Sequence, residues 1–110
     1  MEHQDFKTIT FNSKVKKELD QNKKEVQKPK KFKVVFHNDD YTPMDFVAIL
    51  LASEFHMSAE KAIEITMLIH ETGRGVAGIY SKEIAETKST VCNTIAQTAG
   101  YPLLSTIEPE

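Results

Sequence analysis

The stretch FKVVFHNDDYTPMDF, residues 32–46, decides the fold because it joins an apolar run to an acid-rich turn and then to a helix start. Phe32, Val34 and Phe36 alternate with Lys33, Val35 and His37. This period of two predicts a half-buried β-strand. The polar residues that follow bond the local backbone readily, or they form a receptor for a positively charged group, and both readings stay open. These residues are Asn38, Asp39 and Asp40.

The next residues predict a helix with a defined start. Thr42 is expected as its N-cap and Pro43 as its first helical residue, with Asp45 in the first turn. Its apolar positions follow the helical period: Met44, Val47, Leu50, Leu51 and Phe55. Ser58 then predicts the cap of a second helix that runs to about Thr72.

This second helix carries apolar residues around much of its circumference. Ala62, Ile65, Thr66 and Ile69 share one face, and Ile63, Met67 and His70 lie beside them. Such a pattern predicts a core helix that is packed on more than one side. Thr66, Ile69 and His70 are spaced i, i+3 and i+4, so they present on one side of the helix.

The remainder predicts a strand, a helix and a last strand. GRGVAG, residues 73–78, has the spacing of a dinucleotide-binding loop, but a helix precedes it and an apolar strand follows, so we reject a nucleotide site. Gly73 instead ends the second helix. A third helix runs from Ser81 to Gly100, and LLSTIE, residues 103–108, is extended. The order β-α-α-β-α-β predicts an α+β domain, with three helices on one face of a small antiparallel three-stranded sheet.

Length and charge limit the function classes. With 110 residues the chain has room for one domain, and no apolar run approaches the ~20 residues of a membrane span, so we expect a soluble, cytoplasmic protein with no membrane partner. Residues 1–31 hold nine Lys against five acids and no amphipathic period, which predicts a flexible, mostly disordered Lys-rich extension before a domain at 32–110. Acids lie between its lysines and no aromatic residues alternate with them, so nucleic acid is not an expected ligand.

Enzyme motifs are absent. No G-x-S-x-G, Walker loop, Cys pair or H-E-x-x-H occurs, so we expect neither an enzyme nor a cofactor. His37, Asp39, Asp40 and His70 lack the spacing of metal ligands, so no metal site is expected. The lone Cys92 falls in an apolar helical pattern and is interpreted as a packing residue.

Four segments carry a resemblance to a known family. VVFHNDDYTPMDFV, MLIH, AETK and PLLSTIE resemble the bacterial ClpS adaptors, over about residues 33–108. The resemblance implies a small, monomeric, non-enzymatic protein. Such a protein binds others with a free α-amino group and a bulky hydrophobic first residue (Leu, Phe, Tyr or Trp). It delivers them to the N-terminal domain of the ClpA unfoldase of the ClpAP protease, the N-degron pathway.

The resemblance also implies the roles of individual residues. Asn38, Asp39 and His70 would bind the α-amino group. The first side chain would enter a pocket lined by Asp40, Thr42, Met44, Val47, Thr66, Ile69 and Leu103. Tyr41, Glu83 and Lys88 would contact ClpA.

Two features stay open after the resemblance. Thr66 stands where the family usually has Met, which predicts a roomier pocket with an altered ranking of first residues. Lys88 lies in the apolar stripe of the third helix, where a snorkelling stem is the simpler account. A general protein-interaction module of the same fold and an acid/base or metal-dependent enzyme remain as alternatives to the adaptor.

Overall fold

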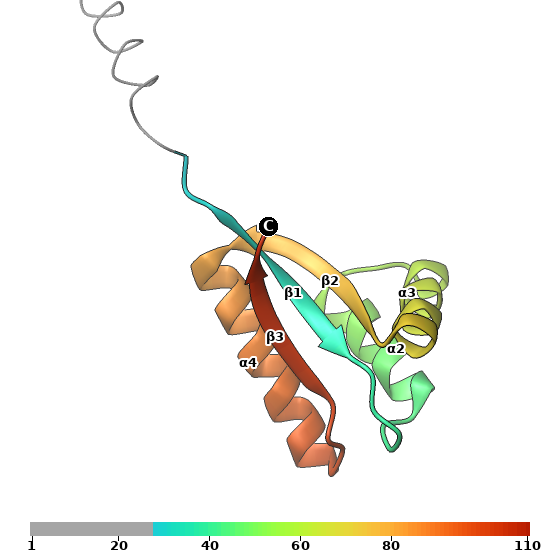
Figure 1. The fold of residues 1–110 in the computed structure, drawn as a ribbon. Coiled ribbons are helices and arrows are strands. Elements are labelled where there is room, and N and C mark those ends of the chain that lie inside the picture. Colours follow the sequence, from blue (N-terminus) through green and yellow to red (C-terminus); the bar gives the residue numbers. More distant parts are fainter. Residues whose placement is uncertain (1–27) are drawn as a thin grey trace, which may run out of the picture.

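The computed structural model describes residues 28–110. The elements follow the chain as β1 (Lys31–His37), α2 (Met44–Glu54), α3 (Ala59–Thr72), β2 (Arg74–Ser81), α4 (Lys82–Ala99) and β3 (Leu104–Pro109) (Figure 1). The predicted order and the α+β class are confirmed. The predicted flexible extension, residues 1–31, lies almost entirely outside the described residues. Its last residue, Lys31, belongs to β1 and pairs with Ser81.

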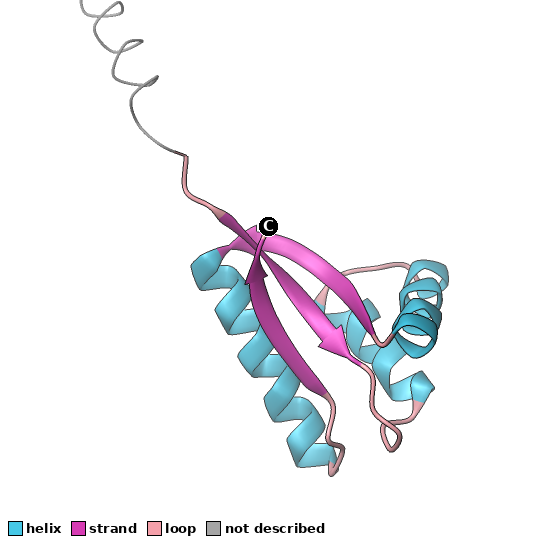
Figure 2. Ribbon diagram, in the orientation of Figure 1, coloured by secondary structure: helices cyan, strands magenta, loops and turns pink. Residues whose placement is uncertain are grey.

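The three strands form one antiparallel sheet in the order β2-β1-β3 (Figure 2). β1 is the central strand, so it is protected along both edges. Val35 was expected on the exposed side of this strand, yet it is completely buried. It pairs with Val76 on one neighbouring strand and with Thr106 on the other, whose side chains flank it.

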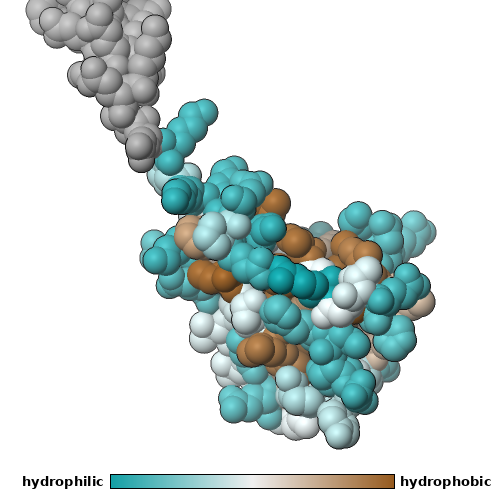
Figure 3. All heavy atoms as spheres, viewed as in Figure 1, coloured by the Kyte–Doolittle hydropathy of each residue, from teal (hydrophilic) through white to brown (hydrophobic). Residues whose placement is uncertain are grey.

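The core lies between the sheet and the helices. Val34 and Phe36 of β1 meet buried residues from all three helices, and α4 runs behind the sheet in the view of Figure 1. Burying a side chain such as Phe36 or Leu51 contributes about 1.5–3 kcal/mol. The opposite face of the sheet has no helix over it in this view, and Figure 3 shows its apolar areas separated by hydrophilic ones.

The first helix begins one residue later than predicted. Its N-cap is Pro43, in an extended conformation, and no side chain caps it. The Thr42 hydroxyl, expected to be the cap, donates to Asp39 Oδ2 at 2.8 Å instead. Sequence could not separate these outcomes, because a Thr-Pro pair suits both a helix cap and a turn.

α3 packs against both α2 and β2, but of the two sets of residues predicted to be packed only the first face is buried. Ser58 caps it as predicted, with its hydroxyl accepting from the Lys61 backbone N–H at 3.1 Å. Only Ala62, Thr66 and Ile69 are buried. The residues expected beside this face are exposed: Ile63 is 57% and Met67 41% exposed, and His70 is also exposed. No further element from residues 28–110 covers them.

α4 also departs from its predicted stripe. Ala85, Cys92 and Ala96 are buried as expected, but Ile84 and Val91 are exposed. Their place in the core is taken by polar residues: the Ser89 and Ser105 hydroxyls lie 2.8 Å apart, and Asn93 accepts from the Ser105 backbone N–H at 2.7 Å. These bonds fix β3 against α4, and no buried side-chain nitrogen or oxygen atom among residues 28–110 lacks a hydrogen-bond partner.

Cys92 and Gly100 behave as the sequence indicates. Cys92 is buried in the core, and this burial raises the pKa of its thiol to about 12, so the residue stays a neutral packing side chain. Gly100 ends α4 in the left-handed conformation. Within residues 28–110, no helix has both the length and the apolar character needed to cross a bilayer.

Lys88 has a structural partner that the sequence did not reveal. Its Nζ donates to the Glu54 carbonyl at 2.7 Å, and it lies 5.5 Å from the ring centres of both Phe55 and Tyr80. Glu54 is the last residue of α2, where backbone carbonyls have no partner in their own helix. The ammonium therefore stabilises the end of α2 by hydrogen bonding and by the helix dipole.

We expect Lys88→Met to lower the free energy of unfolding by about 1–2 kcal/mol, because it keeps the stem but removes the hydrogen bond and both cation–π contacts. Urea unfolding followed by circular dichroism measures this. Lys61→Met is the matched control, since the exposed Lys61 side chain forms a pair with Glu64 at 3.5 Å that contributes little. Equal stability of the Lys88→Met variant and the wild-type protein would contradict this role.

Candidate functional site

The acid-rich turn is fixed to the end of α3. The Asn38 backbone N–H donates to the Gly73 carbonyl at 2.9 Å, directly after β1 ends. Gly73 caps α3 in the left-handed conformation, with φ at 95°, as predicted. A Cβ on Gly75 would lie 2.7 Å from Ile69 Cγ1, so only glycine lets β2 start this close to α3. These contacts bring the last turn of α3, with His70, beside the turn.

Asp39 organises the turn with its carboxylate. Its Oδ1 accepts from the backbone N–H groups of Tyr41 at 2.8 Å and Thr42 at 2.7 Å, and its Oδ2 accepts from the Thr42 hydroxyl at 2.8 Å. The local-bonding reading of this acid is therefore confirmed. Burial raises the pKa of Asp39, but the hydrogen bonds from Thr42 and Tyr41 outweigh it and leave that pKa below 3.8. Asp39 thus stabilises the fold above pH 3.8, an effect lost as the pH falls through the lowered pKa.

Side chains at this turn can still accept further hydrogen bonds. A carboxylate offers about four lone-pair positions, and three hydrogen bonds occupy Asp39. The side chains of Asn38 and His70 are exposed and form no hydrogen bond with any other residue in 28–110. A charged carboxylate, an amide oxygen and an imidazole are therefore available to a ligand that carries N–H donors.

A small pocket opens beside the turn, with a volume of about 20 Å³. It is lined by His37, Asn38, Asp39, Thr42, Met44, Val47, Thr66, Ile69, His70 and Leu103. The structure thus brings together all the residues predicted for amino-group and side-chain binding except Asp40. The pocket joins polar groups from the turn to walls that are nearly inaccessible to solvent, with Val47 and Leu103 each 6% and Ile69 3% exposed.

Two residues differ from the prediction. Asp40 was expected in the pocket wall, but it is exposed and is absent from the lining, because the turn is folded around Asp39. His37 lines the pocket and was not predicted. Its Nε2 lies 2.8 Å from the Thr106 hydroxyl, so a neighbouring strand holds the ring. The available signal was its position directly before Asn38, where the strand runs into the site.

Thr66 lies in the pocket wall with its hydroxyl turned to its own helix, donating to the Ala62 carbonyl at 2.7 Å. This bond reduces the polarity that Thr was expected to bring. The pocket is also not roomy as it stands, since 20 Å³ holds about one water molecule.

The described part of the chain, residues 28–110, holds no group of three His, Cys, Asp or Glu side chains placed to bind a metal ion. His37, Asp39 and His70 do share one pocket, but Asp39 already accepts three local hydrogen bonds. The arrangement therefore suits a ligand that donates hydrogen bonds.

The three residues predicted to contact ClpA do not form one cluster. Tyr41 is 80% exposed in the turn that follows the end of β1. Glu83 is exposed in the first turn of α4, which begins beside the start of β1. The length of β1, ~20 Å at 3.3 Å per residue, lies between them. Lys88 is half-buried on α4.

Fold and pocket together define a small α+β domain with a pocket beside its acid-rich turn. Comparison with known proteins identifies its family: residues 27–106 match the family model described as ATP-dependent Clp protease adaptor protein ClpS. The chain belongs to the ClpS family, which consists of adaptors and not of proteases.

Relatives in several bacteria agree with this assignment. The Clp protease adapter protein ClpS of Bdellovibrio bacteriovorus is 51% identical over 82 residues, covering 74% of this chain and 72% of the relative. ClpS 1 of Bradyrhizobium diazoefficiens is 39% identical over 100 residues, covering 91% and 99%. The structure of Agrobacterium tumefaciens ClpS2 bound to L-phenylalaninamide matches with a TM-score of 0.74 at 40% identity, over 76% of this chain and all of that one.

Proposed function

We propose that this chain binds proteins whose first residue is Leu, Phe, Tyr or Trp with a free α-amino group, and delivers them to the ClpA unfoldase of the ClpAP protease. One observation carries the proposal: the pocket joins an ionised turn to apolar walls, and a relative of the same fold binds L-phenylalaninamide. That ligand has the two features of such an N-terminus, a free α-amino group and a large apolar side chain.

The amino group is the first part of the recognition. An α-amino group has a pKa of about 7.7–8.0 and is mostly protonated at neutral pH. Burying an ammonium is costly unless acceptors surround it. Asp39 supplies a negative charge, Asn38 an amide oxygen and His70 an imidazole nitrogen, all lining one pocket. Hydrogen bonds of this charge-assisted kind contribute roughly 1.5–3 kcal/mol each.

The side chain is the second part. The apolar walls of the pocket come from three places in the sequence: Val47 on α2, Ile69 on α3 and Leu103 before β3. Burying a Leu or Phe side chain there is worth about 1.5–3 kcal/mol. Association costs about 4–15 kcal/mol, so burial of the side chain cannot offset it alone, and the hydrogen bonds to the amino group offset only part of that range. A ligand must offer both features.

The test of this proposal compares two peptides that differ only in the first residue. We expect the Leu-initiated peptide to bind about 30-fold more tightly than the Ala-initiated one. The Leu side chain buries more apolar surface, which contributes about 2 kcal/mol more to the free energy of binding. Fluorescence anisotropy with a C-terminally labelled peptide measures both affinities. A general interaction module, the alternative function, would bind the two peptides equally.

Thr66 is proposed to tune the ranking of first residues. We expect Thr66→Met to weaken binding of Ile- and Val-initiated peptides about 5-fold relative to Leu-initiated ones. The longer Met side chain leaves less space around the branched Cβ of the ligand's first residue, and this crowding has a small steric cost. The same anisotropy assay with six peptides (Leu, Phe, Trp, Tyr, Ile and Val) gives the ranking. An unchanged ranking would show that residue 66 does not select the ligand.

Docking to ClpA is proposed to involve Glu83 and Lys88 on α4, with Tyr41 at the far end of β1. Glu83 is exposed in the first turn of α4, and its side chain forms no hydrogen bond or ion pair with another residue in 28–110. Lys88 has its structural role at the end of α2. Glu83→Arg is therefore the informative variant for ClpA binding. A Lys88 variant that binds ClpA less tightly could do so either because docking is impaired or because the fold is less stable.

A further inference from the structure

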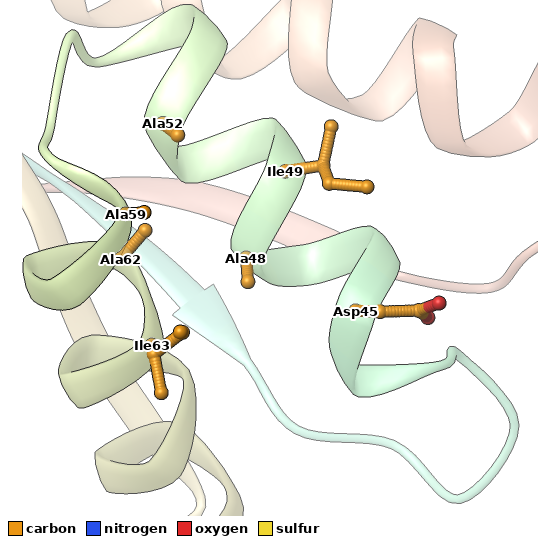
Figure 4. A pocket seen from close by; sticks show the side chains of 7 residues that line it. All are labelled: Asp45, Ala48, Ile49, Ala52, Ala59, Ala62 and Ile63. Atoms are coloured by element: carbon orange, nitrogen blue, oxygen red, sulfur yellow. The ribbon is translucent and has the colours of Figure 1, made fainter.

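An apolar groove of about 280 Å³ lies between α2 and α3, separate from the pocket beside the turn. Figure 4 shows the side chains of both helices that line it: Asp45, Ala48, Ile49 and Ala52 of α2, and Ala59, Ala62 and Ile63 of α3. Most of these residues are alanines, so short side chains leave the space open. An apolar cavity of about 150 Å³ holds a benzene-sized molecule, so this groove has room for a phenyl ring.

The border of the groove is apolar and exposed. Ile49 is 67% exposed and Ile63 is 57% exposed. An adjoining hollow of about 140 Å³ shares Ala48 and Ile63 and extends the groove to Met67, which is 41% exposed. Nothing from residues 28–110 fills this space. Exposed apolar surface that is gathered in one place is typical of a site where another polypeptide segment binds.

Charge limits what can bind in the groove. The two helices carry five acids and one Lys, a formal charge of −4 with His neutral: Asp45, Glu54, Glu60, Glu64, Glu71 and Lys61. A second copy of this chain would bring the same charge to the interface, and like charges placed together disfavour such a complex. The occupant should therefore carry apolar side chains together with positive charges.

A segment with this chemistry precedes the domain in the same chain. It is FKTITFNSKVKK, residues 6–17, which lies outside the described residues. Its apolar side chains include two phenyl rings, those of Phe6 and Phe11. It has no acid and carries a formal charge of +4, from Lys7, Lys14, Lys16 and Lys17. The segment thus matches the groove in the size of its apolar groups and opposes it in charge.

The chain is long enough for this segment to reach the groove. Phe32, at the start of β1, pairs with Tyr80, whose ring centre lies 6.3 Å from that of Phe55 at the end of α2. The end of α2 is therefore close to the point where the chain enters the domain, and Ala52 of the groove is about one turn earlier on this helix. Residues 18–27 connect the segment to the domain and can span roughly 33–36 Å.

We propose that residues 6–17 dock in the α2–α3 groove of their own domain. Their aromatic side chains enter the apolar space, and their lysines lie beside the acids of the two helices. Docking covers the exposed side chains of Ile49 and Ile63, which other proteins could otherwise contact. The inference does not depend on the recognition of N-terminal residues, because the groove is separate from the pocket beside the turn.

The test attaches a nitroxide to the segment in the full-length protein and records which methyl groups it broadens by NMR. Ser13→Cys supplies the attachment point, since Cys92 is buried and its thiol has a pKa of about 12. We expect the methyl peaks of Ile49 and Ile63 to lose most of their intensity with the oxidised nitroxide, compared with the reduced one.

Ile79 is the internal control for simple proximity. It is 44% exposed and pairs with Lys33, close to the start of β1. A segment that does not dock would spend most of its time near this end of the strand and broaden Ile79 more than the groove residues. We expect the opposite order, with the Ile79 peak largely retained. Broadening of Ile79 that equals or exceeds that of Ile49 and Ile63 overturns the proposal.

Variants on both sides of the contact should abolish the effect. Ile63→Lys places a positive charge in the groove and should restore the Ile49 peak. Ile84→Lys is the matched control, because Ile84 is 49% exposed on α4 and does not line the groove. Phe6→Ser combined with Phe11→Ser removes both phenyl rings without altering residues 28–110 and should also restore the peak. A peak that stays broadened in the variants of residue 63 and of residues 6 and 11 overturns the proposal.

A mixed sample separates docking within one chain from docking between chains. Isotope-labelled protein without a nitroxide is combined with unlabelled protein that carries the nitroxide at position 13. We expect the peaks of Ile49 and Ile63 to keep their intensity in this sample. Broadening there would mean that a second copy supplies the segment, and it would overturn docking in the segment's own domain.

Discussion

Acetylation of the α-amino group of a Leu-initiated peptide is expected to lower its affinity about 1000-fold. The acetyl group removes the positive charge and two N–H donors, and leaves the Asp39 carboxylate in the pocket without a cationic partner. Removing one member of a buried, hydrogen-bonded charge pair costs about 2–5 kcal/mol, and the added acyl group must also be placed in a pocket with little free space. Competition against a labelled Leu-initiated peptide measures the loss.

The same charge can be removed reversibly, which provides a control without the bulk of an acetyl group. Acceptors that stabilise the ammonium raise the pKa of the bound amine above that of the free one. Between neutral pH and about pH 7.7 the affinity should therefore be constant, and above that it should fall up to tenfold per pH unit. The pKa of Asp39 is below 3.8, so this acid stays ionised over the whole range and the profile reports the ligand. Equal affinity of free and acetylated peptides at pH 7 would rule out amino-group recognition.

Local signals in the sequence predict most of the elements. Ser58 and Gly73 begin and end α3 as their side-chain and backbone preferences require. The alternation in residues 32–37 places the central strand within one residue. These features depend on a few neighbouring residues, so a single sequence contains them.

Burial and contacts that depend on tertiary packing are predicted less well from the sequence. Val35 is buried because β2 and β3 flank it on either side. Both strands begin at least 37 residues after the end of β1. The exposed Met67 looks the same in the sequence as a core residue, since periodicity shows a face and not whether another layer covers it. Lys88 has the same problem, because its acceptor on Glu54 is 34 residues away.

The candidate site shows the same division. The acid-rich turn is visible in the sequence, and the resemblance to the ClpS adaptors implies its pocket residues. Spacing alone relates only Thr66, Ile69 and His70, which share one helix. That Val47 and Leu103 face the same space as Ile69 depends on how α2 packs against α3 and on where the segment before β3 lies in the folded domain.

Asp39→Asn is expected to lower the affinity for Leu-initiated peptides about 100-fold while leaving the turn folded. Asn is isosteric with Asp, and its side-chain oxygen can still accept from the Tyr41 and Thr42 N–H groups. The amide nitrogen can donate to the Thr42 hydroxyl in place of the present bond. What is lost is the negative charge that faces the ammonium, worth about 2.7 kcal/mol within the range for such pairs.

Asp40→Asn is the matched control, because it removes the same charge from the adjacent residue. Asp40 is exposed and does not line the pocket, so water and salt screen its field and the loss should be below about 3-fold. Anisotropy at physiological ionic strength, with circular dichroism for folding, compares the two variants. If Asp40→Asn costs as much affinity as Asp39→Asn, the site responds to the general acidity of the turn. A large loss confined to position 39 means that one carboxylate, fixed by three hydrogen bonds, binds the amino group.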